Sequence, residues 1–251
     1  MRLRLIHVDE TCAAIDKPSG LVVHRSEQSA DRRTCMSLLR DRLGRHVYPV
    51  HRLDRGASGV LILGLDPPSA RSLALAFTER RVSKSYLAVV RGWAPESGEI
   101  ERPLAREPGG RSDPALTRFR SLARAEGPHA VGRYPSARYS LVAAEPHTGR
   151  THQLRRHLAG IAHPIVGDVT HGDSRHNRFF REHFSSRRLL LHAWRLELPH
   201  PHGAEPLDLV APPAGELQRL LLALGWQDAL AGLQPPAAPG LEASAAGAAG
   251  R

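Results

Sequence analysis

One acidic residue stands among basic residues at the end of an extended apolar stretch. Asp54 lies in the run His51-Arg52-Leu53-Asp54-Arg55, and the apolar segment Val60-Leu61-Ile62-Leu63 follows closely. Neighbouring positive charge favours the ionised form of a carboxyl group. A carboxylate held in this way can act as a nucleophile or a base at neutral pH. Because a surface ion pair beside a turn has the same pattern, Asp54 is a candidate whose weight depends on the rest of the chain.

Two further residues have the chemistry and the placement to accompany an acid. Tyr86 is the aromatic residue of an otherwise aliphatic, strand-like segment, where an ordinary core tyrosine is the competing interpretation. A predicted helix beginning near His152 places Arg155 at the edge of its apolar stripe and Arg156 nearly opposite. Arg155 can therefore reach a buried carboxylate or, alternatively, lie along the helix surface. Arg156 is expected to face solvent or phosphate.

Four motifs, taken in order, resemble the RluA-type pseudouridine synthase family. They are Lys17-Pro18-Ser19-Gly20-Leu21, residues 51–59, residues 84–92 and residues 147–155. The second motif departs from the family pattern at Ala57, where the family has threonine. The resemblance covers most of the chain and implies an α+β fold, the pseudouridine synthase fold, with a mostly antiparallel mixed sheet and a central catalytic cleft.

The same resemblance implies an isomerase that converts uridine in RNA to pseudouridine without a metal, nucleotide or redox cofactor. It makes Asp54 the essential carboxylate, Arg155 its charge partner, and Tyr86 the ring that stacks on the target base and assists proton removal. It places Arg52 in the space that the flipped base vacates. Base flipping is expected because the reacting atoms are inaccessible in a stacked helix.

A narrower set of segments resembles a branch of this family whose target is uridine 65 of transfer RNA. Residues 155–158 and 171–173 carry this likeness. Arg156, Arg175 and Arg178 are then expected to hold the phosphates that flank the target. Two alternatives stay open, namely a synthase that acts on ribosomal RNA and, from another class, a non-catalytic RNA-binding protein.

The charge balance agrees with an RNA partner. The 251 residues include 35 Lys and Arg against 25 Asp and Glu, a formal net charge of +10, and lysine occurs only at positions 17 and 84. Arginine suits phosphate and base recognition, so a polyanionic partner is expected. The aromatic content of 5% argues against a single-strand stacking platform.

Histidine and cysteine usage indicates neither a metal site nor disulfide bonds. None of the fifteen histidines belongs to an HExxH or Cys/His ligand pattern, and His192, His200 and His202 are interpreted as a solvated turn. Cys12 and Cys35 have no CxxC partner, and no apolar run is long enough to span a membrane. The chain is predicted to be a cytoplasmic monomer with no membrane partner.

The hydrophobic pattern outlines the elements that must position these residues. Strands are expected at 3–8, 12–16, 59–65, 85–91, 137–145, 188–198 and 205–211, and helices at 34–43, from Asp66-Pro67 onward, and at 215–226. Residues 1–233 are expected to form a single catalytic domain, in which the Pro-, Gly- and Arg-rich residues 94–136 are a surface insertion. Residues 234–251 are predicted to be a disordered tail, because their composition cannot bury enough apolar surface.

Overall fold

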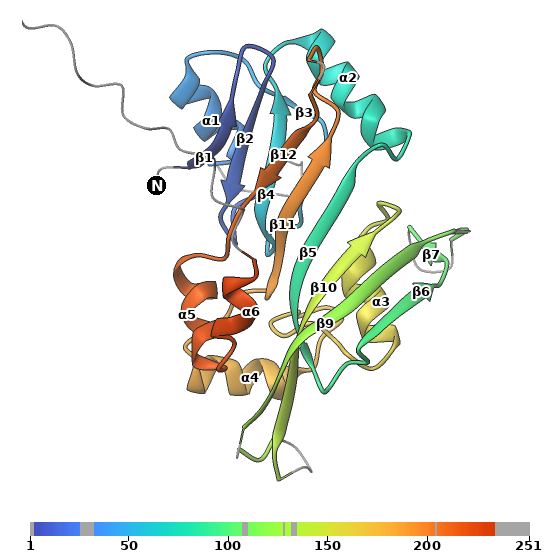
Figure 1. Cartoon of the computed structure of the whole chain (residues 1–251), viewed down its shortest axis with the longest axis vertical. Helices are drawn as coiled ribbons and strands as arrows, with labels where there is room; N and C mark the ends of the chain where they lie inside the picture. Colours follow the sequence, from blue (N-terminus) through green and yellow to red (C-terminus); the bar gives the residue numbers. More distant parts are fainter. Residues whose placement is uncertain are drawn as a thin grey trace, which may run out of the picture.

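The computed structural model describes residues 3–25, 33–106, 110–127, 129–131, 135–203 and 205–233. The predicted tail at 234–251 lies outside these ranges. Within them the chain is built on a ten-stranded sheet in the order β1-β2-β4-β11-β5-β10-β9-β6, with β12 beside β11 and β3 beside β4 (Figure 1). Every strand pair is antiparallel except β4 with β11, which confirms the mostly antiparallel mixed sheet of an α+β fold.

The strands and helices predicted outside residues 94–136 are all present, and β3, α4 and α6 are additional elements that the sequence did not predict. The strands of the sheet are β1 (Arg4–Val8), β2 (Cys12–Lys17), β3 (Tyr48–Pro49), β4 (Ser58–Gly64), β5 (Ser83–Arg91), β6 (Ser97–Glu101), β9 (Leu116–Gly127), β10 (Ala137–Pro146), β11 (Leu191–Leu198) and β12 (Leu207–Val210), while β7 (Leu104–Ala105) and β8 (Ser112–Asp113) form a separate hairpin. The helices are α1 (Cys35–Leu43), α2 (Pro67–Thr78), α3 (Gln153–Gly160), α4 (Ser174–His183), α5 (Gly215–Ala223) and α6 (Gln227–Ala231).

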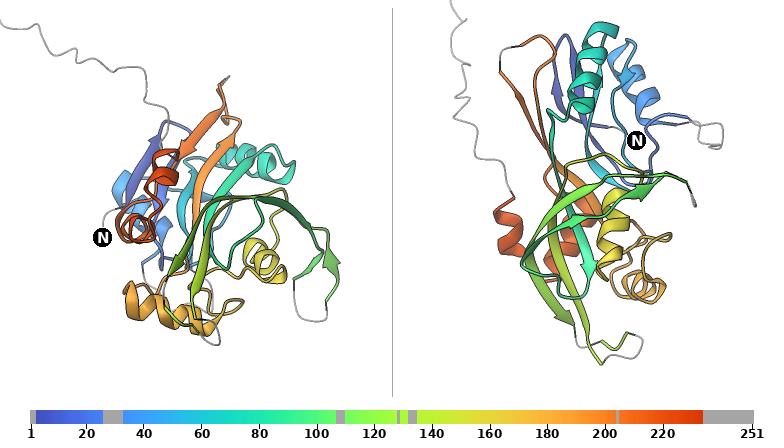
Figure 2. Two further views of the ribbon diagram at one scale, coloured as in Figure 1. Left: turned by 60° about the horizontal axis from the view of Figure 1, so that its bottom comes forward. Right: turned by 90° about the vertical axis from the view of Figure 1, so that its right-hand side faces the viewer.

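Alternation along β5 divides the core between the two faces of the sheet. Ala88 and Val90 pack in one cluster with residues of α1 and α3, whereas Leu87 and Val89 pack in another with residues of α4, α5 and α6. Successive side chains of a strand point to opposite faces, so one strand serves both clusters. The right-hand view of Figure 2 shows α1 and α3 on one side of the sheet and α5 and α6 on the other.

The parallel pair β4–β11 brings two distant parts of the chain into close contact. Gly59 has φ +106°, and a Cβ atom there would lie 2.0 Å from the carbonyl oxygen of Ala193. Beside it, Ser58 donates a hydrogen bond to Nδ1 of His192 (2.7 Å), whose Nε2 donates to the carbonyl of Ala211 (2.7 Å). The interpretation of His192 as part of a solvated turn is therefore wrong: this side chain is buried, and burial lowers its pKa to about 4.

Residues 94–136 differ from the expected surface insertion. Both β6 and β9 belong to the main sheet, and β9 pairs with β10 from Thr117 to Gly127. Phe119 and Ile100 are buried in the core. The alternation of buried and exposed residues along β9 is confined to its first few positions. Only Thr117 and Phe119 of this strand are buried, each followed by an exposed arginine, so the pattern is too short to identify the strand from the sequence. The hairpin β7–β8 is the part of this segment that stands away from the sheet (Figure 1).

Cys12 and Cys35 are both buried and unpaired, and burial raises the pKa of their thiols to about 12 and about 11. Within the described ranges, no helix is long and apolar enough to cross a bilayer.

We expect Gly59→Ala to destabilise the protein far more than Gly44→Ala. Both glycines have positive φ, which costs another residue about 1–2 kcal/mol, but Gly44 ends α1 in open space whereas Gly59 touches the Ala193 backbone. Thermal or chemical denaturation of the two variants measures the difference. Equal losses of stability would show that the close approach of β4 to β11 is not required.

Candidate active site

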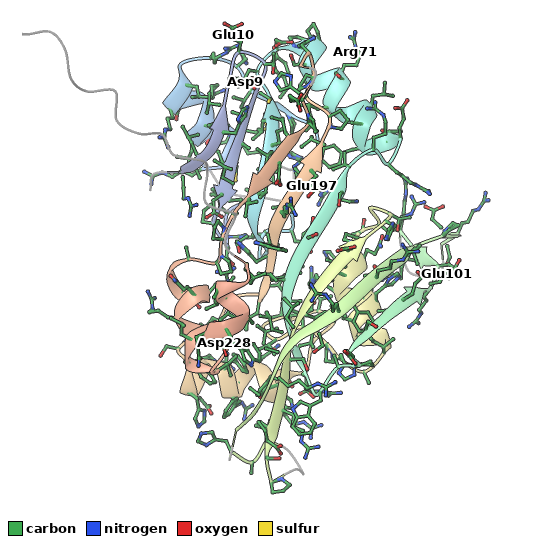
Figure 3. All side chains as sticks on the ribbon, viewed as in Figure 1. Asp9, Glu10, Arg71, Glu101, Glu197 and Asp228 are labelled. Carbon is green, nitrogen blue, oxygen red and sulfur yellow. The ribbon has the colours of Figure 1, made fainter. Side chains whose placement is uncertain are left out.

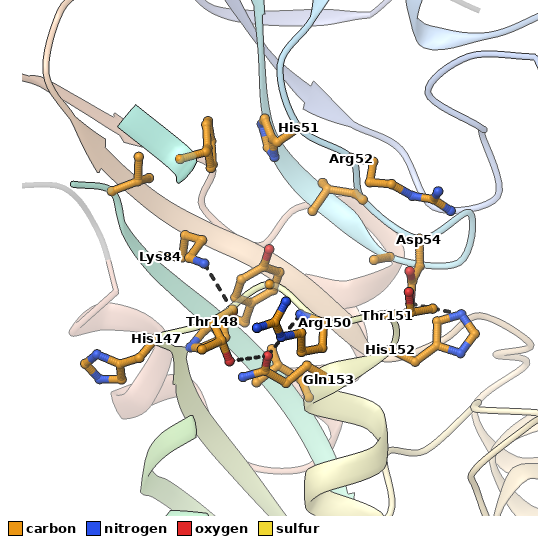
Figure 4. Close-up of a pocket in the computed structure, with 18 of the residues that line it drawn as sticks. His51, Arg52, Asp54, Lys84, His147, Thr148, Arg150, Thr151, His152 and Gln153 are labelled. Atoms are coloured by element: carbon orange, nitrogen blue, oxygen red, sulfur yellow. Dashed lines mark hydrogen bonds and ion pairs between the residues drawn. The ribbon is translucent and has the colours of Figure 1, made fainter. Parts of the chain in front are cut away.

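A cleft of about 780 Å³ collects the residues singled out in the sequence (Figure 4). Its walls come from the loop before β4, the end of α2, the start of β5 and the segment from Pro146 to Arg155. The three expected catalytic residues and Arg52 all line it: Asp54, Tyr86, Arg155 and Arg52. Segments separated by about a hundred positions in the chain thus form a single site, as the motif order predicts.

The first motif holds the loop that carries Asp54. The fully buried Nζ of Lys17 donates to the carbonyl oxygens of Leu21 (2.6 Å) and Arg55 (3.2 Å). Ser19 donates to the carbonyl of Gly56 (2.6 Å). Burial lowers the pKa of Lys17 to about 8. The buried Lys17 thus ties the loop after β2 to the loop that bears Asp54, and so holds that loop in place.

A chain of charges fixes the Asp54 carboxylate. Nη1 of Arg155 donates to Oδ2 of Asp54 (3.0 Å), while its Nε and Nη2 donate to the two oxygens of Asp168 at 2.7 Å each. Arg155 is 8% exposed, and the side chain of Asp168 is fully buried. The bidentate contact with Asp168 sets the plane of the guanidinium, so its remaining edge faces Asp54. The helix phase that places Arg155 inward is confirmed.

Asp168 was not selected as a site residue in the sequence analysis. Its backbone environment holds it as an anion, since Oδ1 accepts from the amides of Thr170 (2.9 Å) and His171 (3.0 Å). Burial alone would raise the pKa of Asp168, but these amides and the Arg155 hydrogen bonds outweigh burial and lower it. The available signal was an acid directly after the apolar pair Ile165-Val166 and Gly167.

His152 presents a second polar group to Asp54. Its Nε2 lies 3.9 Å from Oδ2 of Asp54, and its Nδ1 lies 3.1 Å from Nε2 of His171. Burial lowers the pKa of both rings, so neutral tautomers decide the geometry. If His171 donates to Nδ1, the N–H of His152 is on Nε2 and faces the carboxylate, whereas the reverse tautomer would direct a lone pair at it. The arrangement therefore favours His152 as a hydrogen-bond donor toward the site.

Tyr86 and Lys84 approach the cleft from the same face of β5. They are two residues apart, which places both on one side of the strand, and Nζ of Lys84 donates to the carbonyl of Thr148 (3.3 Å). Burial, reinforced by the charge of Asp54, raises the pKa of the Tyr86 phenol. His51 accepts the amide of Ile62 (3.1 Å), and burial lowers its pKa to about 3. The cleft thus offers a neutral phenol and a neutral imidazole.

The expected RNA-binding arginines do not gather in the cleft. Arg52 is exposed at its edge, and the part of the chain that the structure describes gives its guanidinium no hydrogen-bond or ion-pair partner. Arg156 does not face solvent as expected: it is half-buried and donates to the carbonyl of Ala105 in β7 (2.8 Å), because the hairpin covers that side of α3. Arg175 and Arg178 are exposed on α4 and do not line the cleft.

A group of potential metal ligands lies at the turn between β1 and β2, outside the cleft (Figure 3, label Asp9). It consists of His7, Asp9 and Cys12. The carboxylate of Asp9 accepts the amides of Thr11 (2.7 Å) and Cys12 (2.8 Å), and pairs with His7 (2.6 Å) and His200 (3.0 Å). These contacts close the β1–β2 turn against the end of β11.

Comparison with known proteins identifies the class. The profile of the RNA pseudouridylate synthase family matches residues 11–160, and the chain belongs to this family. It is therefore an isomerase that forms pseudouridine in RNA, as the motifs predict. The solved structure of human RNA pseudouridylate synthase domain containing 1 is 26% identical with a TM-score of 0.69, and the match covers 89% of this chain and 95% of that one.

Similar bacterial proteins share one name. The tRNA pseudouridine synthase C of Pectobacterium carotovorum is 46% identical over 239 residues, which cover 91% of this chain and 64% of that protein. The tRNA pseudouridine synthase C of Vibrio cholerae is 43% identical, and the match covers 91% of this chain and 98% of that protein. The likeness to the narrower branch predicted from sequence is thereby confirmed.

We expect Asp168→Asn to fold but to lose about 100-fold in turnover, the scale of a small misplacement of a reacting group. The ionised Asp168 stabilises the fold above about pH 4, the value in unfolded chains, and this contribution is lost as the pH falls through the lower folded-state pKa. The stability gap from wild type should therefore shrink in acid. Asp208→Asn, in an exposed pair with Arg195, is the matched control. Normal turnover of Asp168→Asn would show that the charge of Asp168 is not needed to position Arg155 for catalysis.

Proposed function

We propose that this protein isomerises uridine 65 of transfer RNA to pseudouridine, with Asp54 as the essential carboxylate. The observation that carries the proposal is the geometry of the Asp54 carboxylate. Arg155 orients it through an ion pair, and its side chain remains 24% exposed in a cleft that Tyr86 also lines. The choice of transfer RNA is supported by the tRNA pseudouridine synthase C relatives, which are 40–46% identical. The reaction needs no cofactor, because nothing is oxidised or removed from the nucleotide.

The reaction exchanges one carbon–nitrogen bond for one carbon–carbon bond. The C1′–N1 bond of uridine breaks, the uracil turns, C1′ joins C5, and the proton on C5 is lost while N1 gains one. The carboxylate can take part by attacking the sugar, by attacking the base or by accepting a proton from C2′. All three routes require an ionised carboxylate, and the hydrogen bond from Arg155 holds the Asp54 carboxylate in one orientation.

Tyr86 is proposed to stack on the uracil and to relay the C5 proton. Its phenol is neutral at physiological pH because its pKa is raised. The hydroxyl must therefore pass on its own proton as it accepts another.

Arg52, exposed at the edge of the cleft, is proposed to fill the space of the flipped base. The catalytic unit is proposed to be residues 1–233, acting as a cytoplasmic monomer, which size-exclusion chromatography can test.

We expect Asp54→Asn to fold and bind RNA but to form no pseudouridine. The substitution keeps the shape of the side chain and removes only its charge, on which all three chemical routes depend. Tritium release from 5-tritiated uridine in RNA measures turnover, and filter binding measures affinity. Asp41→Asn, exposed on α1, is the control. Turnover by Asp54→Asn would mean that another group provides the essential chemistry.

We expect Tyr86→Phe to lose most of its turnover while its KM stays close to that of wild type. The ring that stacks on the base is kept and only the hydroxyl is lost, so the effect should fall on kcat. Tyr48→Phe, in β3 and outside the cleft, is the matched control. An unchanged kcat for Tyr86→Phe would reduce Tyr86 to a packing residue.

The substrate is tested by pseudouridine sequencing of unmodified bulk tRNA and ribosomal RNA after incubation with the purified protein. The expected result is a single modified position, uridine 65, in a subset of tRNAs. Modification confined to ribosomal RNA would leave the isomerase in place and overturn the choice of tRNA. Bound RNA that is never modified would instead favour a non-catalytic RNA-binding protein.

A further inference from the structure

A side cavity of about 240 Å³ adjoins the cleft below the β7–β8 hairpin, and nothing above assigns it a function. Four of its lining residues also line the cleft, so the two spaces are continuous. The lining consists of Leu104, Ala105, Arg106, Gly149, Arg150 and Thr151. Figure 4 shows Arg150 and Thr151 among the side chains of the cleft, on the segment that leads to His152 beside Asp54.

Protein contacts hold both walls of the side cavity in place. On the hairpin side, Arg156 donates to the carbonyl of Ala105 (2.8 Å) and so fastens β7 to α3. On the other side, the amide of Arg150 donates to Oε1 of Gln153 (3.1 Å), which also accepts the hydroxyl of Thr148 (2.6 Å). A cavity with walls fixed in this way loses little freedom when a ligand enters it.

Two guanidinium groups meet at the entrance of the side cavity and share one carboxylate. Asp113 in β8 lies 3.5 Å from Nη1 of Arg150 and 4.0 Å from Nε of Arg106. Both distances exceed the usual length of an N–H···O hydrogen bond, so most of the guanidinium donors stay available. The side chain of Arg106 is 83% exposed. The entrance therefore carries two arginines against one carboxylate, and the one hydrogen bond that these guanidinium groups donate within the described residues runs from Nε of Arg150 to the carbonyl of Pro114 (3.2 Å).

We propose that the side cavity is a subsite for a phosphodiester next to the target uridine, bound by Arg106 and Arg150. The proposal rests on the proposed function, because it requires the target uridine to lie at Asp54. Guanidinium groups match phosphate oxygens in a planar, two-point contact. Among the residues that the structure describes, the lining contains no aromatic side chain on which a base could stack. Opening a paired uridine costs a few kcal/mol per unstacked base, and a neighbouring phosphate contact offsets part of that cost.

The test measures whether the loss of one arginine and the loss of one phosphate charge affect RNA binding independently. A stem-loop RNA containing the target uridine is prepared with the linkage on its 5′ or its 3′ side replaced by an uncharged methylphosphonate. Binding is measured for wild type, Arg106→Ala, Arg150→Ala and the control Arg111→Ala, which lies on the same hairpin outside the cavity. Arg150 also donates to the carbonyl of Pro114, so thermal melting must first show that its variant is folded.

We expect one of the two replacements to weaken binding by wild type and by Arg111→Ala roughly tenfold, the scale of a charge-assisted contact. The same replacement should have little further effect on Arg106→Ala or Arg150→Ala. In each of these two variants, the slope of log K against log salt concentration should also fall in magnitude by about 1, the contribution of one phosphate contact.

Equal weakening of binding in wild type and in both arginine variants, at either linkage, would overturn the subsite. The readout is binding, so it does not depend on turnover. If wild type forms no pseudouridine in the unmodified stem-loop, the proposed function fails whether or not the coupling is seen. If the protein modifies a ribosomal RNA fragment instead, the same two linkages are replaced in that fragment and the criterion is unchanged.

Discussion

The site depends on one buried guanidinium that is shared by two carboxylates. Arg155 is hydrogen-bonded to Asp168 through two nitrogens and to Asp54 through a third. Taking these charges out of water is costly, and removing one partner would leave an uncompensated buried charge. The surrounding structure must therefore keep all three together, which is why three separate segments converge here. Both oxygens of Asp168 accept hydrogen bonds from Arg155 and so position it, whereas Asp54 keeps part of its carboxylate exposed to the cleft.

The helix that carries Arg155 is held by β9, inside the segment whose place in the sheet the sequence concealed. The hydroxyl of Thr117 contacts Nδ1 of His157 (2.9 Å) and accepts from Nε2 of Gln153 (3.0 Å). Both partners are on α3, and all three side chains are buried. Buried polar groups that are fully hydrogen-bonded specify one arrangement of the elements that carry them. Thr117, Gln153 and His157 therefore orient the helix that carries Arg155.

The sequence predicts those features whose causes are local. The inward phase of Arg155 follows from helical periodicity, and the start of α2 follows from Asp66, whose side chain accepts the amide of Ser69 (2.8 Å). The convergence of Asp54, Tyr86 and Arg155 followed from recognising the motifs together, because no single segment specifies it.

What the sequence did not reveal depends on pairing between distant segments. Asp168 is 13 positions from Arg155 across an irregular loop, where no periodic signal relates them. The burial of His192 follows from the parallel pairing of β11 with β4, and the place of β9 follows from its pairing with β10. The side cavity likewise requires a hairpin and a loop that are about forty positions apart. Such contacts have no trace in local hydrophobic patterns.

The parallel contact between β4 and β11 also has a consequence for how the protein is made. Ser58 and His192 are 134 positions apart, and Asp54 and Arg155 are 101 apart. Contacts of such long range close late, because the loop entropy must be lost before the contact forms. On the ribosome, the loop that bears the acid emerges well before the arginine and the strand that complete its surroundings. The nascent chain therefore carries its reactive carboxylate for most of its synthesis without the means to use it.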